Sequence, residues 1–187
     1  MTRDELEHIV RACGRITDWL EFMVAGSQAI LGEIEFPPES LVVSMELDMW
    51  PHGDLTSEER DRISDLIEGS IGEGSVFHDT HKVYAQGIGP ETIKVPSDFL
   101  DRLTRICNRG TDPYIAYCLS PIDVFIGKAV AKREKDRVFC QELLRHGYVN
   151  PSTALVLCDK LPPGVDISRV KATIRRWAKD VDLPVGP

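Results

Sequence analysis

The sequence predicts an α/β (α+β) protein in which strands and helices alternate in the first half and helices dominate the second. Residues 41–50 alternate apolar and polar side chains, as a half-buried strand does. After residue 96 we expect helices at about 97–107, 121–146 with a possible break, 151–159 and 166–179. A small mixed sheet flanked by helices should therefore occupy residues 1–96, with a helical region at 97–187 packed on it as one compact unit.

The first elements have clear start signals. Thr2 and Glu5 predict a capping box for a helix with an apolar side formed by Leu6, Ile9, Val10, Cys13 and Ile16. A short apolar strand should end at Ala25, before a Gly26-Ser27 turn in which Ser27 is a favoured helix N-cap. The N–H groups at such a helix end favour a phosphate, although a Gly-Ser turn alone is more often simple capping.

The strand expected at 41–50 carries two acids on one face. Its polar side would hold Ser44, Glu46 and Asp48. Its apolar side would hold Val43, Met45, Leu47 and Met49. Because the two carboxylates repel each other, a cation should sit beside them, and Mg²⁺ or Mn²⁺ is the candidate that carboxylate oxygens favour. The alternative is a solvent-facing strand with two ordinary surface acids.

Between the acidic strand and residue 96 we expect one helix and two strands. Thr56 and Glu59 predict a second capping box, with the helix running to about Glu68, and 69–75 is a glycine-rich turn. Residues 76–88 and 92–95 should be strands. In an extended segment His78 and His81 would point to opposite faces, so a joint metal site is not expected there.

A basic helix is predicted after Ser120, an N-cap residue followed by Pro121. If the helix is continuous, Lys128, Lys132 and Lys135 share one face, with Asp136 at its edge. Such a row could neutralise a triphosphate; the alternative is a solvated charged face.

Several segments together resemble a known superfamily. Gly26-Ser27 followed by Glu46-Leu47-Asp48 is similar to the signature of the DNA polymerase beta-type nucleotidyltransferases, with Glu where Asp is commoner and an extra loop at 33–40. Residues 84–92, 121–124 and 128–136 resemble small bacterial nucleotidyltransferase-like proteins, which are related more distantly to abortive-infection toxins. The resemblance covers about residues 20–147.

The resemblance implies a minimal nucleotidyltransferase fold and an enzyme that moves a nucleoside monophosphate from a nucleoside triphosphate to an acceptor hydroxyl. By this likeness Gly26 and Ser27 hold phosphates, while Glu46 and Asp48 are catalytic and bind Mg²⁺ or Mn²⁺. Lys128 is the expected catalytic and nucleotide-binding cation. Asp136 would orient it or contact the nucleotide, and Glu91 is the nearest candidate for a third carboxylate on a neighbouring strand.

Two other functional classes stay open. Glu46 at the first acidic position also fits a catalytically inactive nucleotide-binding or protein-binding module. A toxin with a cognate antitoxin is a third possibility. The acceptor could be RNA, protein or a small molecule.

Composition limits the partners. The net charge of −8 disfavours broad nucleic-acid binding, although Arg169 to Lys179 with Trp177 could meet RNA; an amphipathic terminal helix is the simpler interpretation. No apolar run approaches a membrane span and the N-terminus is acidic, so we expect a cytoplasmic protein with no membrane partner. The five cysteines are typical of reduced thiols.

Overall fold

The computed structural model describes residues 1–184 and has the expected α+β composition. Two units emerge: residues 1–93 with 103–119, and residues 94–102 with the chain from Ser120 onward. The predicted boundary at residue 96 therefore lies close to the start of the second unit, but the segment 103–119 returns to the first unit.

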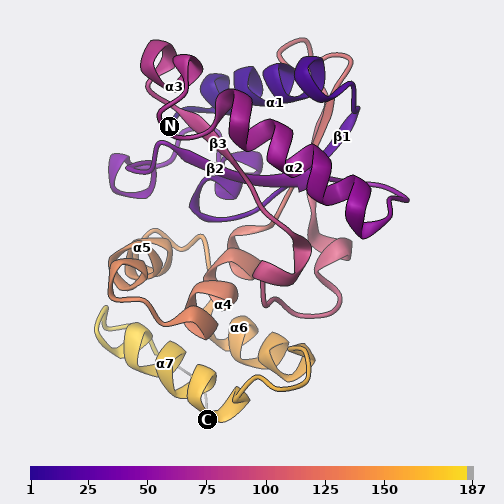
Figure 1. Ribbon diagram of the computed structural model, residues 1–187. Helices are drawn as coiled ribbons and strands as arrows, with labels where there is room; N and C mark the ends of the chain where they lie inside the picture. The colour runs from indigo at the N-terminus through magenta and orange to yellow at the C-terminus, as the bar shows by residue number, and fades with distance from the viewer. Residues whose placement is uncertain (185–187) are drawn as a thin grey trace. The chain divides into compact units, whose positions relative to one another are not determined.

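The described part of the first unit contains a five-stranded mixed sheet in the order β3-β2-β1-β5-β4 (Figure 1). Its strands are β1 (Glu21–Val24), β2 (Glu46–Pro51), β3 (Tyr84–Gly87), β4 (Thr104–Ile106) and β5 (Ile115–Cys118). Strand β1 pairs antiparallel with β2 and parallel with β5, while β2 and β3 are parallel. Strand β4 pairs antiparallel with β5. This topology puts β2 next to the edge strand β3. Residues of the two strands that pair in register point their side chains to the same face of the sheet.

Two capped helices cover one face of this sheet (Figure 1). Both predicted capping boxes are confirmed, at the start of α1 (Arg3–Thr17) and of α2 (Ser57–Ile71). The Cys13 sulfur of α1 lies 3.3 Å from that of Met49 on β2. A Cβ at Gly87 on β3 would meet the backbone of Ser64 on α2. The apolar core of this unit therefore lies between α1, α2 and the sheet.

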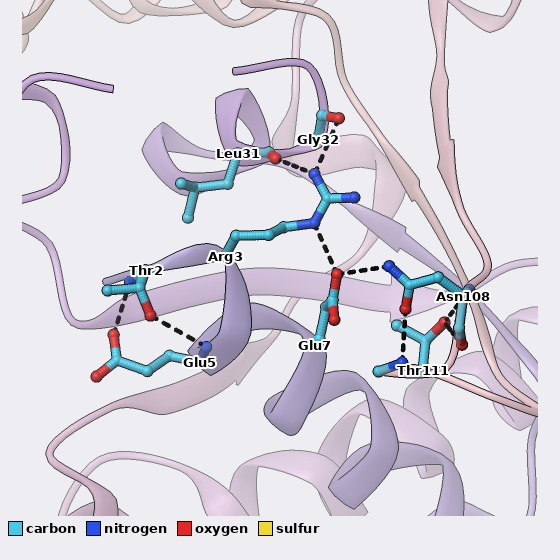
Figure 2. Close-up of polar contacts among 9 residues, drawn as sticks. Thr2, Arg3, Glu5, Glu7, Leu31, Gly32, Asn108 and Thr111 are labelled. Carbon is cyan, nitrogen blue, oxygen red and sulfur yellow. Dashed lines mark hydrogen bonds and ion pairs between the residues drawn. The ribbon is translucent and has the colours of Figure 1, made fainter. Parts of the chain in front are cut away.

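A polar cluster connects α1 to a 3₁₀ helix and to the loop that contains Asn108 (Figure 2). Arg3 Nη1 donates to the carbonyl oxygens of Leu31 and Gly32, at 2.5 and 3.1 Å. Its Nε pairs at 2.9 Å with Glu7, which also accepts from Asn108 Nδ2 at 2.8 Å. Leu31 and Gly32 close the 3₁₀ helix η1 (Ser27–Gly32), so the cluster holds the helix that follows the Gly-Ser turn.

The acidic strand begins later than predicted. A 3₁₀ turn, η2 (Glu39–Leu41), occupies its expected start, and Ser44 Oγ accepts from the backbone N–H of Glu46 at 3.2 Å. Val43 and Met45 were expected to face the core but are 79% and 49% exposed. The side-chain hydrogen bond of Ser44 favours a local turn over the strand ladder, so the strand pairing begins at Glu46.

The strands predicted at 76–88 and 92–95 are largely wrong. Val76–His81 forms helix α3, capped by the Ser75 hydroxyl and ended by Lys82 in a left-handed conformation. Only β3 is a strand in the first segment, and the second follows the 3₁₀ turn η3 (Pro90–Thr92) without forming a strand. His78 and His81 therefore lie one helical turn apart, and their rings contact different neighbours: His78 meets Tyr84, and His81 meets His8.

The helix predicted at 97–107 is also wrong. The 3₁₀ turn η4 (Phe99–Arg102) is followed by β4, and β5 was not predicted. Strand β5 lies between β1 and β4, and its four residues alternate buried and partly buried positions. So short a segment has too few residues for its periodicity to separate strand from helix.

The second unit is built from short helices around Trp177. These helices are α4 (Pro121–Ala131), α5 (Glu134–Arg145), α6 (Pro151–Leu157), η5 (Cys158–Lys160) and α7 (Ile167–Lys179). Trp177 is 1% exposed and its ring centroid lies 5.8 Å from that of Phe125. Helix α7 is thus the amphipathic terminal helix of the simpler interpretation, and Trp177 has no exposed ring to stack on RNA.

The possible break in the basic helix is real. Lys132 ends α4 in a left-handed conformation and α5 starts at Glu134. Lys128, Lys132 and Lys135 therefore do not lie on one continuous helix, so the predicted basic row is wrong. The expected Ser120 cap is present.

Two remaining expectations concern membranes and cysteines. Within residues 1–184, no helix is both long and apolar enough to cross a bilayer. All five cysteines are unpaired; four are buried and Cys107 is exposed.

A buried ion pair holds η4 to α4. The Asp123 side chain is fully buried and receives Arg102 Nε at 2.9 Å and Nη2 at 2.7 Å. The Ser120 hydroxyl adds a third bond, at 2.6 Å. The hydrogen bonds to Asp123 raise the pKa of the Arg102 guanidinium. These bonds are needed because an unpaired buried carboxylate is costly.

We predict that Arg102→Met lowers the free energy of unfolding by about 3 kcal/mol, because it leaves the Asp123 charge buried without its cation. Urea denaturation measures this change. The matched control is Arg137→Met, whose exposed pair with Asp180 should contribute less than about 1 kcal/mol. Equal losses in the two variants would contradict a structural role for the buried pair.

Candidate active site

The two acids predicted to share a strand face do so. Glu46 and Asp48 are partly exposed on one side of β2, while Leu47 and Met49 between and after them are buried on the other. Strand pairing on both sides of β2 fixes its backbone. The carboxylates are therefore presented side by side from a rigid element.

The Gly-Ser turn packs directly against Asp48. The backbone N–H of Ala25, just after β1, donates to the Asp48 carbonyl at 2.9 Å. Gly26 has φ +64° and ψ −165°, a region open in practice to glycine alone. A Cβ at Gly26 would overlap Oδ2 of Asp48. The absent side chain thus lets the backbone turn pass beside the carboxylate, and sequence-distant residues form one site.

Ser27 has a different place from the one predicted. Gly26 occupies the N-cap position of η1, which has no side-chain cap hydrogen bond, and Ser27 is the first residue of the 3₁₀ helix. Its side chain is therefore not the predicted cap. Any phosphate-binding role belongs to the Ser27 hydroxyl and to the backbone N–H groups at the start of η1.

Strand β3 adds two residues that the sequence analysis did not assign to the site. Tyr84 pairs in register with Glu46, and Gln86 with Asp48. With its amide oriented to satisfy both acids, Gln86 donates through Nε2 to Oε1 of Glu46 and, at 3.3 Å, to Oδ1 of Asp48. Glu91, the expected third carboxylate, lies beyond the end of β3 in η3. The position on the neighbouring strand opposite Asp48 therefore carries a neutral amide.

Four carboxylates lie close enough to Tyr84 to act on its phenol. Burial raises the pKa of the Tyr84 phenol, and the nearby carboxylates of Glu46, Glu73, Asp48 and Glu68 raise it further. The same field would attract a divalent cation.

The donor set fits a cation shared with a substrate. Within residues 1–184 there is no group of three or more His, Cys, Asp or Glu side chains placed to hold a metal ion. Mg²⁺ is commonly bound through one or two carboxylates, with waters and substrate phosphates as the remaining ligands. Glu46 and Asp48 supply hard oxygens of this kind.

Lys128 and Asp136 come together in the second unit. Lys128 Nζ lies 2.7 Å from Oδ1 of Asp136, and 4.8 Å from the ring centroid of Phe139. The two side chains therefore form an ion pair within the second unit. The pair belongs to a different unit from Glu46 and Asp48.

A hollow lies near the histidines of α1 and α3. It has a volume of about 300 Å³ and is lined by Asp4, Glu5, His8, His81 and Val83. Burial, with the charges of His81 and Arg11, lowers the pKa of His8. The neutral imidazole is thus favoured. The residues that line the hollow do not include Glu46 or Asp48.

Comparisons with known proteins give no match: no family model fits the chain, and no curated protein or solved structure is similar to it.

We predict that Gly26→Ala destabilises the first unit by about 2 kcal/mol or more, because alanine is strained at this backbone conformation and its methyl group meets Asp48. Thermal and urea unfolding measure the loss. Gly147→Ala is the control, because Gly147 also has a positive φ but has open space where a Cβ would lie. A loss no greater than that of Gly147→Ala would argue against the close approach to Asp48.

We also predict that the Tyr84 phenol loses its proton at a higher pH than an exposed tyrosine does. Because its folded-state pKa is raised, its contribution to stability is present below the unfolded value of about 10 and is lost as the pH rises through the higher folded value. The difference in phenolate absorbance between the wild type and Tyr84→Phe gives the midpoint. Glu46→Gln should lower that midpoint; an unchanged midpoint would show that the acidic pair does not act on Tyr84.

Proposed function

We propose that this protein is a metal-dependent nucleotidyltransferase that transfers a nucleoside monophosphate from a triphosphate to an acceptor hydroxyl. The observation that carries the proposal is the close approach of the Gly26 turn to Asp48, beside Glu46. A backbone turn next to two carboxylates can place a phosphate against a cation, and phosphoryl-transfer chemistry depends mainly on such positioning and charge neutralisation.

Each residue has a separate task in this proposal. Glu46 and Asp48 hold the ions, since their oxygens are the hard ligands available on β2. The Ser27 hydroxyl and the N–H groups at the start of η1 bind phosphate oxygens. Bound magnesium or manganese supplies neutralising charge to the phosphates. Lys128, which pairs with Asp136 in the second unit, stays the nucleotide-binding cation that the resemblance implies.

The proposed partners are a nucleoside triphosphate and an acceptor, which could be RNA, a protein or a small molecule. A toxin activity with a cognate antitoxin is one form the function could take. Growth arrest on expression that Asp48→Asn relieves would support it, whereas harmless overexpression would count against it.

The second candidate is a nucleotide-binding or protein-binding module without turnover. Gln86 favours it, because a neutral amide lies opposite Asp48 where a third carboxylate would assist deprotonation of the acceptor. Both candidates share nucleotide binding at β2. Pyrophosphate release from the wild type above the level of Asp48→Asn supports the enzyme, and saturable binding without release supports the module.

We predict that the wild type binds a nucleoside triphosphate only with Mg²⁺ or Mn²⁺, and that Asp48→Asn binds it at least about tenfold more weakly, because one cation ligand loses its charge. Calorimetric titration of each nucleotide measures this, with Asp65→Asn, at an exposed position on α2, as the matched control. Equal metal-dependent binding by wild type and Asp48→Asn would contradict the assignment.

A further inference from the structure

Gln86 occupies the place where charge compensation for the acidic pair is needed. It lies opposite Asp48 on β3, and its amide nitrogen donates to carboxylate oxygens of both Glu46 and Asp48. Two carboxylates on one strand face repel each other, and a hydrogen-bond donor shared between them offsets part of that repulsion. The neutral Gln86 side chain supplies such a donor from the neighbouring strand.

The backbone of β3 cannot readily withdraw this amide. On one side β3 is hydrogen-bonded in register with β2. At the next residue, Gly87 packs so closely on α2 that even a Cβ would meet the Ser64 carbonyl. The Gly87 N–H also donates to Glu68 Oε2 at 3.2 Å. The amide can therefore leave the acids only through rotation of the Gln86 side chain.

We propose that Gln86 sets the cation affinity of this site: its amide nitrogen competes with a free divalent cation for the two carboxylates. In the orientation that satisfies both acids, Gln86 turns its N–H₂ group toward them, and this group has two donors and no lone pair to offer a metal. A cation that bridges Glu46 and Asp48 therefore has to break both hydrogen bonds before the amide can turn its carbonyl oxygen toward the ion. A free cation consequently binds weakly, and the favoured ligand is a cation already complexed by a triphosphate. This inference rests on the proposed function.

The test uses Mn²⁺ alone, with free and bound ion distinguished by electron paramagnetic resonance. Gln86→Leu removes the competing donors and keeps an uncharged side chain at this position, so it should bind Mn²⁺ about threefold more tightly than the wild type. Gln86→Glu adds a third carboxylate and should bind it at least about tenfold more tightly. Gln141→Leu is the matched control, because Gln141 donates to Asp180 at 3.0 Å and is an amide-to-carboxylate pair of the second unit. It should leave Mn²⁺ binding unchanged.

The outcomes separate this inference from the proposed function. Weaker or equal Mn²⁺ binding by Gln86→Leu, with tight binding by Gln86→Glu, would overturn the competitor role and leave the metal site standing. No Mn²⁺ binding by any variant, Gln86→Glu included, would overturn both.

A second readout needs no metal. In the presence of a chelator, Gln86→Leu should lower the urea midpoint, and the same change should lower it less in an Asp48→Asn background, because the repulsion that the amide offsets is then reduced. Equal losses in the two backgrounds would show that Gln86 does not compensate the acidic pair.

Discussion

Repulsion between two like charges on one strand face is the constraint on which the proposed site depends. Glu46 and Asp48 stay on one face because β2 is paired on both edges and its other face is buried, so the strand cannot turn over to separate them. Gln86 donates hydrogen bonds to both carboxylates, and the backbone turn at Gly26 lies close to Asp48. A charged pair kept at some cost to stability is the arrangement expected where ligand binding repays it.

The packing of the first unit supports these few atoms. Arg3 and Glu7 on α1 hold the carbonyl end of η1, whose other end carries Ser27. Helix α2 meets β3 at Gly87, one residue after Gln86. Helix α1 thus supports η1 and helix α2 supports β3, and each of these two helices begins with a capping box. Rigid support of this kind is what a cation or phosphate site requires, because a small loss of geometry lowers affinity sharply.

Local signals in the sequence predicted those parts of the fold that local physics controls. The capping boxes at Thr2 and Thr56 depend on residues three apart, and the shared face of Glu46 and Asp48 depends only on the strand period. Strand β5 depends on its pairing with β1, far away in the chain, so periodicity alone could not find it. The late start of β2 depends on a side-chain hydrogen bond of Ser44 that the alternation of residues 41–50 does not reveal. Gln86 was missed because its role requires the register of β3 on β2. The alternation of buried Val83 and Ala85 with partly exposed Tyr84 and Gln86 was nevertheless a usable signal of a strand. The basic row failed because Lys132 adopts a left-handed conformation that nothing in a lysine-rich run indicates.

The central claim is that the carboxylates of β2 receive a cation together with a triphosphate. The most direct measurement is anomalous diffraction at the manganese edge from crystals grown with Mn²⁺ and a non-hydrolysable nucleoside triphosphate. We predict an anomalous peak in contact with both Glu46 and Asp48, with the phosphates beside the Gly26-Ser27 turn. A nucleotide bound elsewhere, or bound at the turn with no manganese on these two carboxylates, would contradict the account.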